Sequence, residues 1–481
     1  MSKNLTVGPP ARLIVFFTLP LLIGNLFQQL YLFTDAVVVG RMLGVEALAA
    51  VGGTSGLTFL LIGFTMGSSA GLAIPVARAF GARDLPRMRR HVAAGAYVSL
   101  LIAVVISVGG TLAARPMLTL LRTPADVIDQ SVGFLMVTFG GSIVTVAFNF
   151  LSSVIRALGD SRTPLIFLIS ACVLNAGLSI TFVGVLHLGV PGAALATIVA
   201  QFVAVALCLG LVKAKMPQLH LRGADWRPRP AELRETAKLG MAMGFQFSII
   251  AIGALVLQYN VNGLGPQAMA AFIASGRIDQ VAGAPLNSFS IAVSTFTAQN
   301  RGARQWRRIR LGVFRTAWIA VGLAFVLGAI NIIFGTPLVR LFVGGSEQAV
   351  ITMAHQYLII QGSLYGILAI LYVLRGTIQG MGWTFVPTVA GFMELFFRAL
   401  AGMAFVSRWG FLGVSWASPL AWTGSVVILV PAWIVLRRRL LRRQHEDERS
   451  AYDLSGERTV VFDATPVRQL VAAELPVASR A

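Results

Sequence analysis

The sequence predicts an all-α polytopic membrane protein, in which twelve transmembrane helices form two parallel six-helix repeats. Three observations lead to this fold class: an apolar composition, long apolar segments that recur along the chain, and an internal repeat. Hydrophobic residues make up 56% of the chain and charged residues only 12%. So few charges could not cover a water-soluble surface, and each long apolar segment is therefore a candidate membrane span.

Apolar segments of about 20 residues or more, the length needed to cross a bilayer, recur between short polar breaks. We expect six of them on each side of a linker rich in proline and charge. The predicted spans are 13–39, 48–77, 92–113, 128–155, 163–185, 192–213, 237–261, 268–299, 312–333, 350–378, 384–407 and 412–436. They divide the chain into an N-lobe (1–213), a cytoplasmic linker (214–236), a C-lobe (237–440) and a polar cytoplasmic tail (441–481) that we expect to be disordered.

The repeat is visible in the letters of the sequence. The segment 43–50 recurs as 264–271, and Gly-Ala-Arg at 81–83 recurs at 302–304, both at an offset of 221 residues. Gly159 and Gly382 belong to a later matching pair, at an offset of 223. Six helices per lobe is an even number, so both lobes insert the same way up, and transporters bind their substrates between such lobes.

Basic residues set the expected orientation. They gather in the loops around 78–90 and 301–315, in the linker and in the tail, and we also assign Arg375 to this side. Because cytoplasmic loops carry the excess of lysine and arginine, both termini are expected to be cytoplasmic and the protein to lie in the cell (inner) membrane. The net charge of +20 then needs no nucleic-acid partner.

Several kinds of chemistry lack their motifs. The sequence holds no phosphate-cradling G-x-x-x-x-G-K-[ST] loop and no H-E-x-x-H zinc motif, so we expect neither ATP-driven transport nor a metal enzyme. Cys172 and Cys208 fall inside predicted helices without histidine or cysteine neighbours, which argues against a zinc site or a structural disulfide. An intramembrane enzyme would need a nucleophile or metal set that is not found. We expect no cofactor, and transport driven by an ion gradient or running downhill.

The first-helix acid, Asp35, is one of three acids well inside the predicted spans. Charge within a membrane is costly, so such a residue is a functional candidate. Tyr31 lies four residues before Asp35 and shares its helix face. A carboxylate placed there could bind and release a proton, although an acid near the membrane surface without a special role is the alternative.

The other intramembrane charges lie in the C-lobe: Asp279, Glu394, Arg277 and Arg398. Glu394 and Arg398 have i, i+4 spacing, so we expect them to pair, either as a functional or as a structural ion pair. Asp279 and Arg277 are two residues apart and point in different directions. Asp279 is therefore either a functional acid or an internal hydrogen-bond acceptor.

In its motifs, the chain resembles the multidrug and toxic compound extrusion (MATE) family over nearly all of residues 10–437. The similarity rests on an ordered set of motifs in the two repeats: Pro20, Thr34-Asp35-Ala36, Gly40, Ile155-Arg156-Ala157-Leu158-Gly159-Asp160, Asn175, Gly189-Val190-Pro191-Gly192-Ala193-Ala194, Ala196-Thr197 and Ala298-Gln299-Asn300. None of these is specific alone. The resemblance implies two lobes in a V shape and an antiporter that exports organic cations or other amphipathic compounds against protons or sodium ions.

The resemblance also implies an ion site in the N-lobe. The matching residues are Asp35, Tyr31, Asn175 and Thr197, but Ser179 stands where the family has a second acid. A single carboxylate offsets the dehydration of sodium less well than a pair does, so protons are favoured, with sodium at Asp35 still open. Pro20 is expected to allow the first helix to bend.

A flippase for a lipid-linked cell-envelope precursor is the alternative function. It would need a strongly cationic cavity, for which the spans offer only Arg277 and Arg398. The expected partners are small amphipathic or cationic molecules and membrane lipids, and we expect the protein to be a monomer.

Overall fold

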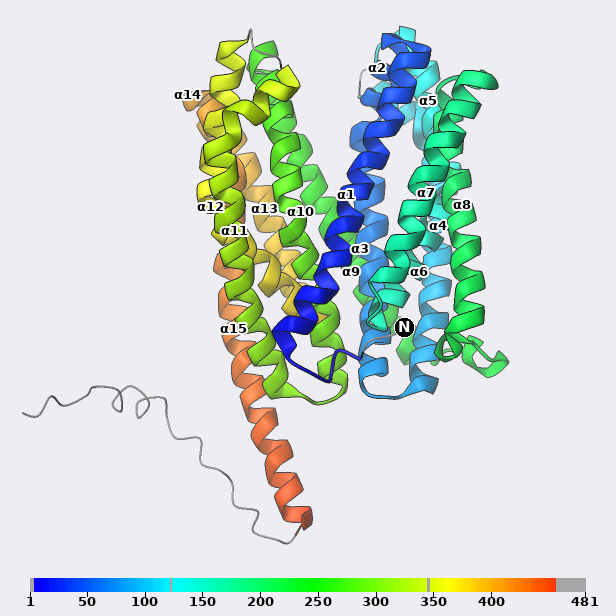
Figure 1. Ribbon diagram of the computed structural model, residues 1–481, viewed down its shortest axis with the longest axis vertical. Coiled ribbons are helices and arrows are strands. Elements are labelled where there is room, and N and C mark those ends of the chain that lie inside the picture. The colour runs from blue at the N-terminus through cyan, green and yellow to red at the C-terminus, as the bar shows by residue number, and fades with distance from the viewer. Residues whose placement is uncertain (1–3, 122, 344–346, 456–481) are drawn as a thin grey trace, which may run out of the picture.

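The computed structural model describes residues 4–121, 123–343 and 347–455, and these residues form helices and turns without a strand (Figure 1). Within these ranges, ten helices are long and apolar enough to cross a membrane, or eleven when one bent pair counts as a single span. The remaining long helix, α10 (Pro266–Gly302), is too polar to meet that criterion but is long enough to cross. The protein is therefore an all-α polytopic membrane protein with the twelve spans that the sequence predicts.

Each predicted span overlaps one helix or one broken helix of the described chain. The N-lobe contains α1 (Pro10–Leu43), α3 (Ser55–Gly81), α4 (Leu85–Leu120), α5 (Ala125–Gly140), α6 (Ser142–Ala157), α7 (Arg162–Ser179) and α8 (Gly189–Lys215). The C-lobe contains α9 (Pro230–Asn262), α10, α11 (Trp306–Val343), α12 (Gln348–Gly380), α13 (Phe385–Leu400), α14 (Val406–Trp409) and α15 (Phe411–Ser455). Helices α5 and α6 form the pair bent by 45°. A short helix, α2 (Val45–Gly53), precedes α3 and was expected to be part of that span.

The two repeats share the geometry of their turns as well as their amino-acid sequence. Arg83, after α3, and Arg304, after α10, both adopt a left-handed backbone, with φ of 58° and 56°. Each lies in a turn with the same backbone hydrogen bonds: the three that the N–H groups of residues 82–84 donate after α3 recur, at the offset of 221, for residues 303–305 after α10. Gly159 and Gly382, with φ of 84° and 73°, play the equivalent part after α6 and α12. The repeated sequence motifs thus form equivalent helix ends in the two lobes.

Two groups of helices diverge from one end of the molecule, α1–α8 in one and α10–α15 in the other (Figure 1). We call the end that holds the N-terminal residues, the α3–α4 and α10–α11 turns and the extended end of α15 the terminal face. The far face carries α2 and α14. Helix α1 packs against α7 of its own lobe and α10 of the other, while α9 packs against α13 and α3 in the same manner. This packing relates the lobes by an approximate two-fold axis.

The backbones of the two lobes approach each other closely where α3 and α10 meet at the terminal face, and α3 also packs extensively against α9. A Cβ atom built on Gly81 would lie 2.0 Å from the carbonyl oxygen of Gln299, and one built on Gly302 would lie 1.9 Å from that of Arg78. These two contacts are equivalent under the offset of 221. Only glycine permits backbones to approach this closely, so the glycines of the repeated motif hold the two lobes together.

Polar contacts also hold this end together. The Leu5 backbone N–H donates to Gln299 Oε1 at 3.0 Å, and Gln299 Nε2 donates to the Ala157 carbonyl oxygen at 2.7 Å. Asn300 Nδ2 donates to the Leu5 carbonyl oxygen at 3.2 Å. The N-terminal segment and α10 are therefore fastened to the first lobe.

The connector and the tail differ from their predicted bounds. Between α8 and α9, residues 216–229 form a connector with two short 3-10 helices, shorter than the expected linker of 214–236. Residues 441–455 were expected to be disordered, but α15 continues through them to Ser455. The rest of the predicted tail, 456–481, lies outside the described residues.

Candidate functional site

The N-lobe candidate residues come from three helices. Tyr31 and Asp35 lie one turn apart on α1, Asn175 and Ser179 lie one turn apart at the end of α7, and Thr197 lies on α8. Helix α7 continues directly into a π-helical segment, Ile180–Val185, and α13 of the other repeat continues into one at Ala401–Phe405. Such segments are rare and often mark functional sites.

Hydrogen bonds converge on the Asp35 carboxylate. Ser179 Oγ donates to Asp35 Oδ1 at 3.1 Å, and Thr197 Oγ1 donates to Oδ2 at 3.1 Å. When the Asn175 side-chain amide is flipped, so that its oxygen and nitrogen exchange places, Asn175 Nδ2 donates to Asp35 Oδ1 at 3.1 Å and Asn175 Oδ1 accepts from the Thr197 backbone N–H at 3.3 Å. Tyr31 Oη donates to the Thr197 carbonyl oxygen at 3.5 Å, so it contacts the shell of the site and not the carboxylate.

The site is buried on one side and carries a single charge. Asn175 and Ser179 are fully buried and Tyr31 is nearly so, whereas Asp35 and Thr197 are half-buried. In the part of the chain that the structure describes, no basic side chain forms an ion pair with Asp35. Three neutral donors therefore hold the carboxylate, which can gain or lose a proton without breaking an ion pair.

The predicted pairing of Glu394 with Arg398 is wrong. Glu394 on α13 forms its ion pair with Arg375 on α12, and Ser425 Oγ donates to Glu394 Oε1 at 3.1 Å. Arg398 instead donates from Nη1 to the Ile250 carbonyl oxygen on α9, at 3.3 Å. The i, i+4 spacing allowed an ion pair within α13, but a partner on the neighbouring helix has the better geometry.

Arg375 was not expected among the intramembrane charges. It was assigned to the basic side with the loops, and it lies near the end of α12 at Gly380, where it is only 6% exposed. The signal was present, because Arg375 falls within the predicted span 350–378 and an arginine inside a membrane span needs a partner.

Asp279 belongs to a second hydrogen-bonded group. Tyr365 Oη on α12 donates to Asp279 Oδ1 at 2.6 Å, and Asn331 Nδ2 on α11 donates to Tyr365 Oη at 2.8 Å. The charge of Arg398 acts on Asp279 as well. Arg277 is exposed on α10 and has no part in this group.

The two lobes thus differ in electrostatics although they share a fold. The C-lobe places two acids, Asp279 and Glu394, near two arginines, Arg375 and Arg398, so its formal charges balance. The N-lobe site has the charge of Asp35 alone. Protonation of Asp35 would leave the N-lobe site neutral, whereas protonation of Asp279 or Glu394 would leave the C-lobe group with a net positive charge.

Comparisons with known proteins agree with the fold and the repeat. The MatE family model matches residues 20–181 and 242–404, once in each lobe. The chain is 29% identical over 389 residues to the probable multidrug resistance protein YpnP of Bacillus subtilis, covering 79% of this chain and 85% of that protein. It is 28% identical over 432 residues to the probable multidrug resistance protein YoeA of the same organism, covering 87% and 92%.

A solved structure shows the same fold. It is described as the outward-facing conformation of a multidrug resistance MATE family transporter, and it matches with a TM-score of 0.83 at 20% identity, over 92% of this chain and 99% of that one. The family match covers well over half of the residues, with one copy on each repeat. The chain therefore belongs to the MatE family of multidrug efflux transporters, and it is a transporter and not an enzyme.

Proposed function

We propose that this protein is a secondary active antiporter that exports organic cations and other amphipathic compounds in exchange for protons. The observation that carries the proposal is the Asp35 carboxylate, half-buried in a membrane lobe, held by three neutral donors and paired with no cation among the described residues. Such a group can couple proton uptake to a change in local charge. The names of the relatives support multidrug export as the direction of transport.

The proposed orientation places the terminal face in the cytoplasm and the protein in the cell (inner) membrane. The arginines of the α3–α4 and α10–α11 turns and of the α15 end all lie at this face, as the positive-inside rule requires. With this orientation, the closely packed end of the lobes is cytoplasmic, and the structure corresponds to an outward-facing state. We further propose that one chain is the transporting unit.

A coupling route follows from the packing of α1. The charged Asp35 ties α1 to α7 and α8 through its hydrogen bonds, and α1 also packs against α10 of the other lobe. Protonation would remove the charge and require one hydroxyl donor to turn, which weakens that tie. Pro20, between Asp35 and the terminal face, leaves the Phe16 carbonyl without its helical N–H partner, so α1 can bend there.

Protons are proposed over sodium because the site holds one carboxylate. A sodium ion would find oxygen atoms on Ser179, Thr197 and Asn175, but only one negative charge to offset its dehydration. The change Ser179→Asp supplies a second carboxylate. It is expected to raise the sodium dependence of export, and a variant that still responds only to a pH gradient would contradict this account.

Purified protein in liposomes provides the main test. Asp35→Asn keeps the shape of the side chain but fixes it in a neutral form, so it should still insert while losing uphill export driven by a pH gradient. Asp129→Asn is a matched control, because Asp129 is an exposed acid in a surface ion pair with Arg115. If Asp35→Asn exported a panel of cationic compounds at the control's rate, Asp35 would have no coupling role.

The flippase remains an outcome of the same experiment. The comparisons give it no support, and two of the arginines within the C-lobe spans are engaged: Arg375 with Glu394, and Arg398 with a backbone carbonyl. Translocation of a lipid-linked pyrophosphate with no export from the compound panel would replace the antiporter proposal.

A further inference from the structure

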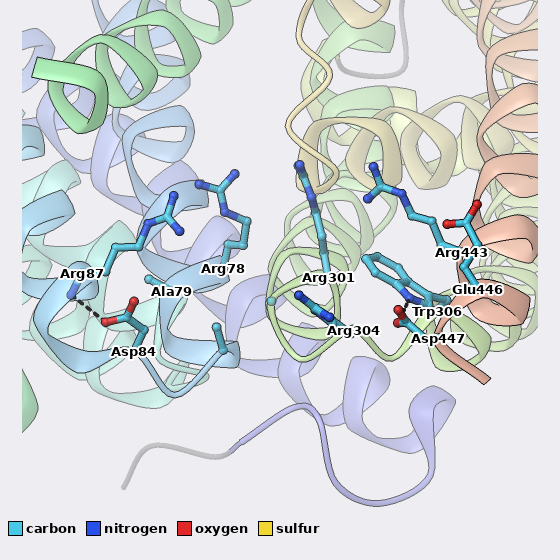
Figure 2. Close-up of a pocket in the computed structure, with 12 residues that line it drawn as sticks. Arg78, Ala79, Asp84, Arg87, Arg301, Arg304, Trp306, Arg443, Glu446 and Asp447 are labelled. Carbon is cyan, nitrogen blue, oxygen red and sulfur yellow. Dashed lines mark hydrogen bonds between the residues drawn. The ribbon is translucent and has the colours of Figure 1, made fainter. Parts of the chain in front are cut away.

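The terminal face contains a basic cavity that the transport site does not use. Its volume is about 410 Å³, and it lies between the lobes where α3 meets α10. Figure 2 shows Arg78 and Arg87 on one wall, and Arg301, Arg304 and Arg443 on the other. The first wall belongs to the N-lobe, whereas the second comes from the end of α10, the turn after it and the extended end of α15.

Five arginines and three acids, Asp84, Glu446 and Asp447, line the cavity, and a fourth acid, Glu235, pairs with Arg78, so the arginines outnumber the acids. Asp84 caps α4 by accepting from the Arg87 backbone N–H at 3.0 Å, and Asp447 accepts from Trp306 Nε1 at 2.8 Å. Arg78 forms a two-bond ion pair with Glu235 at 2.7 and 2.8 Å. Over the described ranges, no carboxylate forms an ion pair with the other four arginines.

The like charges are close enough to act on one another. The charges of Arg78 and Arg443 both act on Arg301, which is half-buried and donates to the Met381 carbonyl oxygen. Arg443 lies over the Trp306 ring at 5.4 Å, which holds its guanidinium at the cavity wall. Because the arginines outnumber the acids, an added anion would reduce the repulsion among the guanidinium groups.

The topology of the membrane protein does not account for this arrangement. The positive-inside rule requires basic residues in the loops, but it does not require arginines from both lobes to line one cavity. Guanidinium groups match phosphate oxygens with paired hydrogen bonds, and a cavity of this volume accommodates a small phosphate-bearing group.

We propose that this cavity binds a phosphate-bearing polyanion that bridges the two lobes and favours the closed terminal face. Gly302, one of the two glycines at the close approach of α3 and α10, lines the cavity itself. Separation of the lobes would pull the arginine walls apart, so a bridging anion opposes that separation. The phosphate is carried either by an anionic lipid headgroup or by a soluble molecule, and this inference does not depend on coupling at Asp35.

Two probes distinguish these sources. The full chain is titrated with inorganic pyrophosphate in a neutral detergent, and separately with cardiolipin in phosphatidylcholine nanodiscs. The test variant is the double change Arg304→Gln and Arg443→Gln. The control is Arg307→Gln and Arg442→Gln, because these two arginines are exposed on the same face, do not line the cavity and remove the same total charge.

We expect at least one probe to bind the wild-type protein, with affinity about tenfold or more weaker in the cavity variant and changed less than about threefold in the control. Binding of pyrophosphate alone would assign a soluble ligand, and binding of cardiolipin alone a lipid headgroup. The proposal is overturned if neither probe binds, or if both double variants weaken binding equally, since general surface charge would then explain the effect.

A second measurement tests bridging and does not depend on the double variants. Spin labels at Lys215 and Arg438, one on each lobe and both exposed, report the separation of the lobes at the terminal face in a chain without Cys172 and Cys208. The bound probe should increase the population at short distance. Binding that leaves the distance distribution unchanged would overturn the bridging role.

Discussion

Alanine at Gly302 tests how the two lobes are held together. The added Cβ would lie 1.9 Å from the Arg78 carbonyl oxygen, whereas contacts of a Cβ below 3.0 Å are essentially never seen. Helices α3 and α10 must therefore part by about 1 Å, which is the overpacking that costs about 1–3 kcal/mol in a packed interior. The obstructing atom is backbone, so no rotamer change relieves the clash. Gly81→Ala should act in the same way, because its Cβ would meet the Gln299 carbonyl oxygen at 2.0 Å.

The penalty applies to the closed terminal face alone, since the two backbones need not touch once the lobes have separated. A difference of about 1–3 kcal/mol changes the ratio of closed to open molecules by about 5- to 150-fold. Spin labels at Lys215 and Arg438 measure this ratio as a shift toward longer distances. Gly302→Ala and Gly81→Ala should both show the shift.

The matched control for this test is Gly283→Ala. Gly283 lies on the same helix, α10, but a Cβ built there would meet no atom within 4 Å. It therefore reports the general effect of alanine on the helix without the clash. If Gly302→Ala and Gly283→Ala gave the same distance distribution, the close approach of α3 and α10 would not control the separation of the lobes.

Two further predictions concern the C-lobe and the orientation. Glu394→Gln should destabilise the protein by about 3–5 kcal/mol because it leaves Arg375 buried and unpaired. In thermal unfolding, adding Arg375→Gln should restore part of that lost stability. Adding Arg398→Gln to Glu394→Gln should instead give a nearly additive loss. A double change with Arg375 that is simply additive would show that the ion pair does not form. Single cysteines at Arg87 and Arg307 should resist membrane-impermeant thiol reagents added to intact cells, and labelling from outside would reverse the proposed orientation.

The sequence predicts most of the fold because membrane helices are set by length and hydropathy. Where contacts decide a boundary, the prediction fails. Residues 441–455 are polar and were expected to be disordered, yet they continue α15 as a helix. The helix end is held by tertiary contacts: Arg443 lies over the Trp306 ring at 5.4 Å, and Asp447 accepts from the Trp306 indole. The hydropathy of the sequence does not predict such tertiary contacts.

The candidate site shows a similar limit. Spacing along a helix correctly places Tyr31 and Asp35 on one face, and the family resemblance supplies their neighbours on α7 and α8. Spacing also suggested a pair between Glu394 and Arg398, because it identifies possible partners only on the same helix. The partner of Glu394 is on α12, and finding it requires the packing of α12 against the helices around it.

The repeat explains why one fold can hold two different electrostatic sites. At the offset of 223, Arg398 of α13 corresponds to Asn175 of α7. In the N-lobe, Asn175 donates a neutral hydrogen bond to Asp35, whereas in the C-lobe a guanidinium stands at the matching place and its charge acts on Asp279. A proton added to Asp35 removes a charge that no cation compensates. A proton added to an acid of the C-lobe would instead expose the charge of an arginine in a low-dielectric setting, which is costly. We therefore expect proton-driven change to occur in the N-lobe, as proposed for Asp35, and the C-lobe network to stay charged while the lobes move.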